Sequence, residues 1–233
     1  MKIKKLLYLI LFLSAGVFSQ KFTYTPYSEF LNKYVSLTGN VNYDEIYLNK
    51  VELDQIIKNF EDNTPNEKAT KNEKMVYWIN SYNVHMIKLV IENYPLTTMN
   101  AIVEPWKVNF VNYKGIVISL DYIENEILRK MNDPRVLFAL NSASISSAIL
   151  KNEAYEVAIL DKQLNSNCLF FINDPTKNSI TPEKAVLSKI FLWYAIDFVN
   201  STNMIKFINQ FSLVKISEAT QITYNEFNFD LNK

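Results

Sequence analysis

The chain has 233 residues with 24 basic and 24 acidic side chains, so its formal net charge is zero and no nucleic-acid partner is expected. Hydrophobic residues make up 48% of the chain, enough for one compact domain with a sizeable core. Three glycines leave no room for a glycine-rich phosphate loop, and a single histidine with a single cysteine argues against a zinc site. Neither a metal nor another cofactor is therefore expected.

The first segment, residues 1–19, has the pattern of a secretory signal peptide. Basic residues precede the apolar run Leu6–Leu13, and Ser19 would be the last residue removed. The run is too short to span a membrane as a helix, although an uncleaved anchor helix is the alternative. We expect an exported protein, periplasmic or extracellular, in which residues 20–233 form a single domain without a stable membrane span.

Apolar residues spaced three and four apart predict helices over much of the chain. The expected helices are Phe22–Val35, Glu45–Phe60, Glu73–Asn93, Tyr122–Met131, Ala154–Phe171, Lys189–Val199 and Asn203–Phe211. Two runs, Val108–Tyr113 and Ile116–Leu120, flank Lys114-Gly115 and predict a β-hairpin. Asp121 with Glu124 fits a capping box at the fourth helix, and the aromatic tail Ile222–Leu231 should pack back onto the domain. The predicted fold is α+β, helix-rich around a small, mostly antiparallel sheet.

The helix Glu73–Asn93 carries Asn80 and Asn83 on one face of a largely apolar segment. A buried amide without a partner costs about 1–3 kcal/mol, so both side chains need hydrogen bonds. They are either clamps for neighbouring loops or groups that orient a ligand. Clamps are the default, because most buried side-chain amides bond to backbone.

The stretch Asp133–Leu150 is the best candidate for a site. A turn leads into the apolar run Val136–Leu140, predicted as a strand, and small polar residues then gather on a loop. The loop residues expected to bind a ligand, together with Asn80 and Asn83, are Asn141, Ser142, Ser144 and Ser147. No histidine, cysteine or carboxylate lies between positions 141 and 147.

Seven short motifs in a fixed order, from Tyr27 to Asn232, resemble the family called domain of unknown function 547. They are FLNKYVSLTGNVNYDEI, YWINSYNVHMIKLVIENYP, SLDYIENEILR, DPRVLFALNSASISSAIL, LFFINDP, LSKIFLWYAIDF and ITYNEFNFDLN. The resemblance implies an α+β domain with a distant likeness to papain-type or transglutaminase-type folds. It carries over no activity.

The chain departs from the family pattern, which reads H-F-A-L-N-C-x-S-x-S-C-P-x-L at the candidate site. Leu137 stands in place of the histidine, and Ser142 and Ser147 stand in place of the two cysteines. A further histidine of the family corresponds to Lys88, whereas His85 lies on another helical face. Thiol chemistry needs such a cysteine–histidine pair. The resemblance thus implies either a kept fold with lost chemistry or residues that were structural in the family.

Other polar residues of the family pattern are retained, and we expect Glu124, Arg129 and Arg135 to be structural. Cys168 falls in an apolar helical stripe and is expected to be a core residue.

Three functions are open at this point. The preferred one is a catalytically inactive domain that binds a small molecule or peptide at the loop after Val136–Leu140. The second is a hydrolase or transferase with Ser147 as nucleophile and His85 or Lys88 as base, since a serine hydroxyl needs a base within hydrogen-bond reach. The third is a structural or interaction domain. The first is preferred because the loop lacks an evident nucleophile–base pair.

Overall fold

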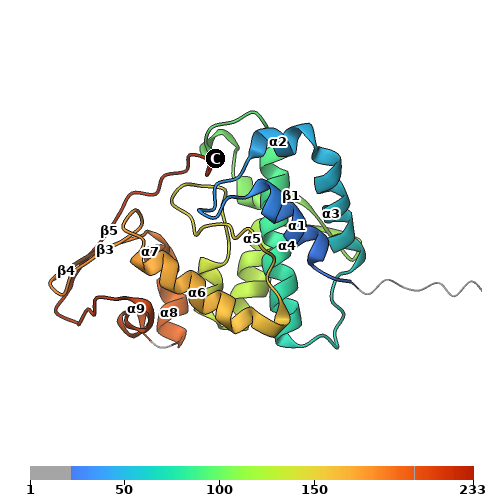
Figure 1. Cartoon of the computed structure of the whole chain (residues 1–233). Coiled ribbons are helices and arrows are strands. Elements are labelled where there is room, and N and C mark those ends of the chain that lie inside the picture. The colour runs from blue at the N-terminus through green and yellow to red at the C-terminus, as the bar shows by residue number, and fades with distance from the viewer. Residues whose placement is uncertain (1–21, 202) are drawn as a thin grey trace, which may run out of the picture.

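The computed structural model describes residues 22–201 and 203–233 (Figure 1). The predicted signal peptide, residues 1–19, lies outside the described residues, so export stays a prediction. Within the described residues, every helix is too short or too polar to cross a membrane.

Four helices form the N-terminal half: α1 (Thr25–Tyr34), α2 (Tyr43–Leu48), α3 (Lys50–Asp62) and α4 (Lys71–Glu92). Helices α2 and α3 pack against α4, the long central helix in Figure 1, and α1 packs against α2 and α3. A capping box of Thr70 and Glu73 starts α4. The helix predicted over Glu45–Phe60 is two helices, because the Asn49 side chain bonds to the Glu45 carbonyl oxygen where α2 ends.

The predicted hairpin is present as the antiparallel strands β1 (Asn109–Tyr113) and β2 (Ile116–Ser119). Two short 3-10 helices, η1 (Met99–Ala101) and η2 (Pro105–Lys107), precede it. A helical stretch follows as α5 (Leu120–Tyr122), the π-helix η3 (Ile123–Leu128) and the 3-10 helix η4 (Arg129–Met131). Its cap is Ser119, whose hydroxyl accepts from the Tyr122 amide, so the expected Asp121–Glu124 capping box is wrong.

The strand predicted over Val136–Leu140 is also wrong, because Pro134–Phe138 forms the 3-10 helix η5. The Asp133 carboxylate accepts from the Arg135 amide, and Pro134 occupies the first helical position. A side-chain cap followed by proline is a helix start signal. These local signals outweigh the apolar run, whose pattern fits a short strand and a short helix equally well.

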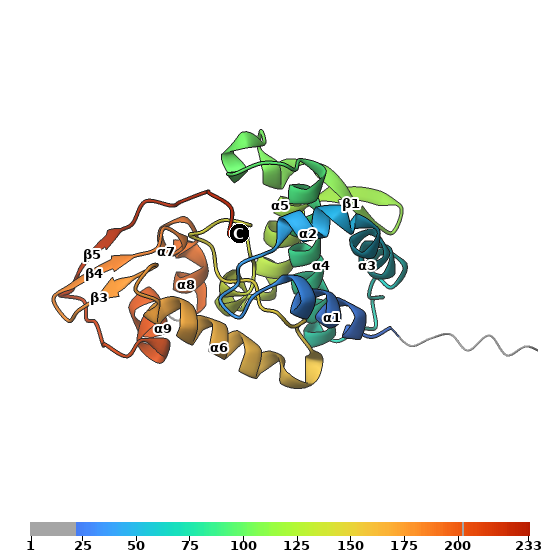
Figure 2. The ribbon, with the colours of Figure 1, turned by 45° about the horizontal axis from the view of Figure 1, so that its top comes forward.

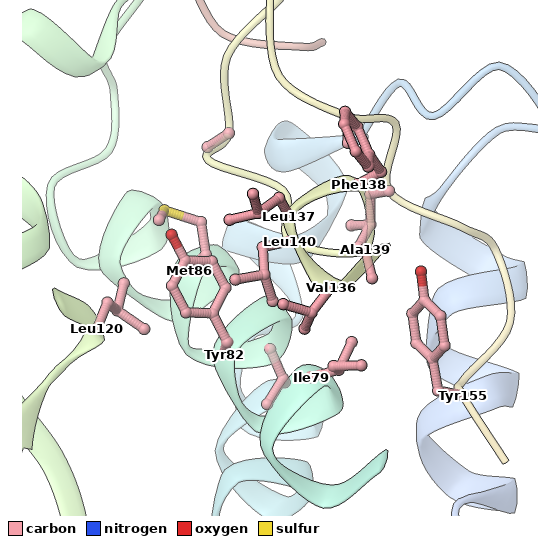
Figure 3. Packing of buried hydrophobic residues seen from close by; sticks show 14 of the residues in the cluster. Ile79, Tyr82, Met86, Leu120, Val136, Leu137, Phe138, Ala139, Leu140 and Tyr155 are labelled. Carbon is pink, nitrogen blue, oxygen red and sulfur yellow. The ribbon is translucent and has the colours of Figure 1, made fainter. Parts of the chain in front are cut away.

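Helix η5 joins two parts of the core. Figure 3 shows Val136, Leu137 and Leu140 turned toward Tyr82 of α4, whereas Phe138 points away from them. The Phe138 ring instead lies 5.0 Å from the Phe171 ring and 5.8 Å from the Phe207 ring, measured between ring centroids. Helix η5 therefore packs against both halves of the molecule.

The C-terminal half consists of η6 (Val157–Ile159), α6 (Leu160–Asn173), β3 (Ser179–Ile180), β4 (Lys184–Leu187), α7 (Ile190–Trp193), α8 (Ala195–Ser201), α9 (Met204–Phe211) and β5 (Gln221–Tyr224). Strand β4 pairs antiparallel with β3 and parallel with β5. Figure 2 shows this sheet on the opposite side of the molecule from α1 and α3. The fold is therefore α+β, helix-rich with small sheets.

The predicted helix Ala154–Phe171 begins later than expected, at Leu160 after the short turn η6. The aromatic tail packs back as predicted: after β5 it runs across the molecule toward α2 (Figure 1). There the Asn232 side chain accepts from the Tyr43 hydroxyl at 2.8 Å and donates to the Gly39 carbonyl oxygen at 3.0 Å.

Gly39 gives a stability prediction with an internal control. Its φ is +85°, and a Cβ added there would lie 2.7 Å from Cβ and 3.2 Å from Cα of Ile149. Gly115 has nearly the same φ, +84°, but an added Cβ would meet nothing within 4 Å. We expect Gly115→Ala to lower the free energy of unfolding by about 1 kcal/mol and Gly39→Ala by about 3 kcal/mol. Urea unfolding monitored by circular dichroism compares them, and equal losses would contradict the close-packing argument.

Candidate functional site

Asn80 and Asn83 each hold the backbone of another segment. Asn83 Nδ2 donates to the Ala139 carbonyl oxygen, and its Oδ1 accepts from the Asn141 amide, both at 2.9 Å. Asn80 makes the same pair of bonds, also at 2.9 Å, to the amide and carbonyl groups of Tyr155. Both side chains are buried. They are clamps that fix the segments on either side of the candidate loop.

The loop itself is held by bonds among its own residues. Asn141 Nδ2 donates to Ser147 Oγ at 2.9 Å and to the Ala148 carbonyl oxygen at 2.7 Å. Ser147 Oγ donates to the Ser144 carbonyl oxygen at 2.7 Å, and Ser144 Oγ donates to that of Ser142 at 3.0 Å. The predicted residues are thus brought together, and Ser142 and Ser147 border the cavity described below.

The two bases predicted for Ser147 have other partners. His85 Nδ1 donates to the Ser81 carbonyl oxygen at 2.7 Å, and its buried Nε2 has no hydrogen-bond partner within the described part of the chain. Burial lowers the pKa of His85 to about 4. Lys88 Nζ forms ion pairs with Asp54 at 2.5 Å and Glu92 at 3.3 Å. Neither base lines the cavity that Ser147 borders.

A cavity of about 550 Å³ lies between α4, the stretch α5–η4, the candidate loop, α7 and the segment after β5. Much of its wall is aromatic. The rings that line it belong to Tyr82, Trp106, Trp193, Tyr194, Phe227 and Phe229. Of these lining residues, Trp193 is exposed and Tyr82 is buried. Such a cavity has the size and apolar character of small-molecule sites.

One aromatic wall is continuous. The Trp193 ring lies 5.0 Å from Phe227, Phe227 lies 4.7 Å from Phe229, and Phe229 lies 6.1 Å from Trp106, measured between centroids. These residues come from η2, α7 and the C-terminal segment. Because these segments are far apart in the sequence, the sequence motifs alone did not predict that their aromatic residues meet at one site.

The polar end of the cavity is built around Glu124, a residue expected to be structural. Its side chain is buried, and Tyr82 Oη donates to it at 3.4 Å. Burial raises the pKa of Glu124, an effect that the hydrogen bond from Tyr194 and the charge of Arg129 partly offset. A buried carboxyl with a raised pKa that faces a cavity is a candidate functional group.

Arg129 and Arg135 both make ion pairs. Arg129 pairs with Asp197 at 2.8 Å, and its guanidinium lies 5.0 Å from the centroid of the Tyr194 ring. Arg135 pairs with Asp133 at 2.7 Å and does not line the cavity. Arg129 does line it, so this residue shapes the site as well as linking η4 to α8.

No metal site appears among the described residues, where no three His, Cys, Asp or Glu side chains are grouped to hold an ion. Cys168 is buried in α6, and burial raises the pKa of its thiol. It does not line the cavity. A buried thiol with a raised pKa is a poor nucleophile, so Cys168 is a core residue.

Comparison with known proteins identifies one family. Its sequence model, described as "Protein of unknown function, DUF547", matches residues 66–172, somewhat less than half of the chain. The match includes Tyr82, Glu124 and the candidate loop, whereas the aromatic residues after position 172 lie outside it. No curated protein and no solved structure matches the chain. Over residues 66–172, the chain carries a domain of the DUF547 family.

Proposed function

We propose that this protein binds a small organic molecule in the cavity between α4, α7 and the candidate loop, and that it does so without catalysis. The observation that carries the proposal is the cavity itself. Its volume of about 550 Å³ lies within the range of about 300–1,000 Å³ that holds small ligands. An aromatic wall faces a few polar groups, Glu124, Arg129 and Ser142, which could orient what enters.

The contacts of Ser147 favour binding over serine-based hydrolysis. Its hydroxyl donates to a backbone carbonyl oxygen of its own loop, and the group that donates to it is the Asn141 amide. A nucleophilic serine needs a base that accepts its proton. His85 is bonded to its own helix, and Lys88 is paired with carboxylates.

The chain offers a direct assay, because Trp106 and Trp193 line the cavity and Trp78 is buried elsewhere. Three tryptophans give three indole N–H signals in the NMR spectrum of 15N-labelled protein. Suitable probes are benzyl alcohol, benzoate and benzyltrimethylammonium. Each has one aromatic ring, and they carry a neutral, a negative and a positive group, respectively. At least one probe should shift the signals of Trp106 and Trp193 and leave that of Trp78 unchanged.

A substitution that fills the cavity tests whether those shifts report binding inside it. Ser142→Phe should weaken the response, because Ser142 lines the cavity. Ile145→Phe is the matched control, since Ile145 is exposed on the same loop and does not line the cavity. The proposal is wrong if no probe shifts either signal at millimolar concentration, or if both variants respond like the unmodified protein.

A further inference from the structure

Both basic side chains that line the cavity are already engaged. Lys107 Nζ lies 2.5 Å from Glu104. The Arg129 guanidinium lies 2.8 Å from Asp197. Each of these positive charges is paired with a carboxylate. Arg129 also acts on Glu124 and Lys107 on Asp121, but only through longer-range electrostatic interactions without an ion pair.

Two acidic side chains of the lining have no such partner. Asp121 and Glu124 form no ion pair with any side chain in the ranges 22–201 and 203–233. Asp121 accepts from the Asn125 amide at 2.9 Å, and Glu124 accepts from Tyr82 at 3.4 Å. These neutral donors add no positive charge. The lining has Glu104, Asp121 and Glu124 against Lys107 and Arg129, so its net charge is negative when Glu124 is ionised.

The aromatic wall favours the same sign of ligand charge. The face of an aromatic ring carries a negative quadrupole, which attracts a cation within about 6 Å of the ring centre. Trp106, Trp193, Phe227 and Phe229 bring four such rings to one cavity. The aromatic wall and the acidic groups therefore both favour a ligand that carries a positive charge on an apolar group.

Resting on the binding function proposed above, we infer that the ligand is a small organic cation, in which an ammonium nitrogen is carried on an apolar or aromatic group. Its nitrogen would lie near Glu124 and Asp121, and its body would lie against the wall of Trp193 and Phe227. A neutral ligand would leave the two acidic groups unbalanced, and an anion would be repelled by them.

Protonation of Glu124 couples this binding to pH. The titratable and charged groups that face it are Tyr82, Tyr194, Asp121 and Arg129. Burial raises the pKa of both tyrosines, so the phenols stay neutral. A bound cation favours the ionised form of Glu124, so affinity should increase as pH rises through the pKa of that carboxyl.

The three benzyl probes test the inference. Benzyltrimethylammonium should bind about tenfold more tightly than benzyl alcohol, and benzoate should bind most weakly. Glu124→Gln should lower affinity for the cation about tenfold and leave that for benzyl alcohol unchanged. Glu126→Gln is the matched control, because Glu126 is exposed and pairs with Lys130 outside the cavity. If Glu124→Gln does not fold, Asp121→Asn replaces it, with the same direction expected.

A pH series gives an independent reading. Benzyltrimethylammonium has no proton to lose, so any rise of its affinity with pH comes from ionisation of the protein. Because burial raises the pKa of Glu124, this rise should lie above the usual pH range of a carboxyl group, and Glu124→Gln should reduce it. Nα-acetyl-lysine methylamide presents the same charge as a peptide side chain. Tighter binding of this probe than of benzyltrimethylammonium would favour a peptide as the source of the cation, and weaker binding would favour a small molecule.

The outcomes separate the two proposals. Equal or tighter binding of benzyl alcohol or benzoate overturns the cation inference and leaves the binding function standing. If Glu124→Gln lowered the affinity for all three probes by the same factor, the inference would also be overturned. Absence of binding by every probe overturns the binding function itself.

Discussion

Replacing Asn83 by alanine should lower the free energy of unfolding by about 3 kcal/mol. The Asn83 amide bonds to the Ala139 carbonyl oxygen and the Asn141 amide, and the side chain is 3% exposed. Alanine would leave both backbone groups buried without a partner. Each such group costs about 1–3 kcal/mol. Urea unfolding followed by far-UV circular dichroism measures the loss.

A control on the same helix separates this effect from helix propensity. Asn72 is exposed in the first turn of α4, so Asn72→Ala removes an asparagine without breaking a buried clamp. Its free energy of unfolding should stay within about 0.5 kcal/mol of the unmodified protein. A loss in Asn83→Ala no greater than that in Asn72→Ala would show that the clamp contributes nothing.

His85 should make the protein sensitive to mild acid. Its pKa falls from 6.5 to about 4 in the folded protein because the ring is buried. Below pH 6.5 the unfolded chain therefore binds more protons at this residue than the folded chain does, so stability declines as pH falls toward 4. At 1.36 kcal/mol per pKa unit, His85 alone removes about 3 kcal/mol by pH 4.

His85→Leu should abolish this contribution. The His85 ring packs against Phe110, with 6.0 Å between ring centroids, and its Nδ1 donates to a carbonyl oxygen within the same helix. Leucine should therefore change stability at pH 7 by only about 1 kcal/mol. Urea unfolding at pH 7 and pH 4.5 compares the two proteins. Carboxyl groups protonate in both, so the measured quantity is the difference between their losses. Identical losses would contradict the burial of a neutral imidazole.

Local patterns predicted the elements that local forces decide. The apolar stripe of α4 and the Lys114-Gly115 turn of the hairpin both led to correct elements. The run Val136–Leu140 misled because five apolar residues do not distinguish a strand from a short helix. Asp133 and Pro134 carried the deciding signal, a cap and a first-turn proline, but they were interpreted as a turn.

The candidate loop was located from the sequence, whereas the opposite wall of its cavity was not. Ser142 and Ser147 lie in one segment, but Tyr82, Trp193 and Phe229 come together only when distant elements pack. Glu124 was interpreted as part of a helix cap, because the spacing from Asp121 fits one. In the structure Ser119 is the cap, and Glu124 lines the cavity. No local pattern contains that information.

The hydrogen bonds of Asn232 have a consequence for the order in which the molecule assembles. They join residues 189 and 193 positions apart, and Phe227 and Phe229 lie just before them. Contacts so remote in sequence form late, since the entropy of closing the loop opposes them until the rest is in place. We therefore expect the aromatic wall to be added to a largely folded body. Local unfolding of the same segment would open the cavity before the helices around α4 separate.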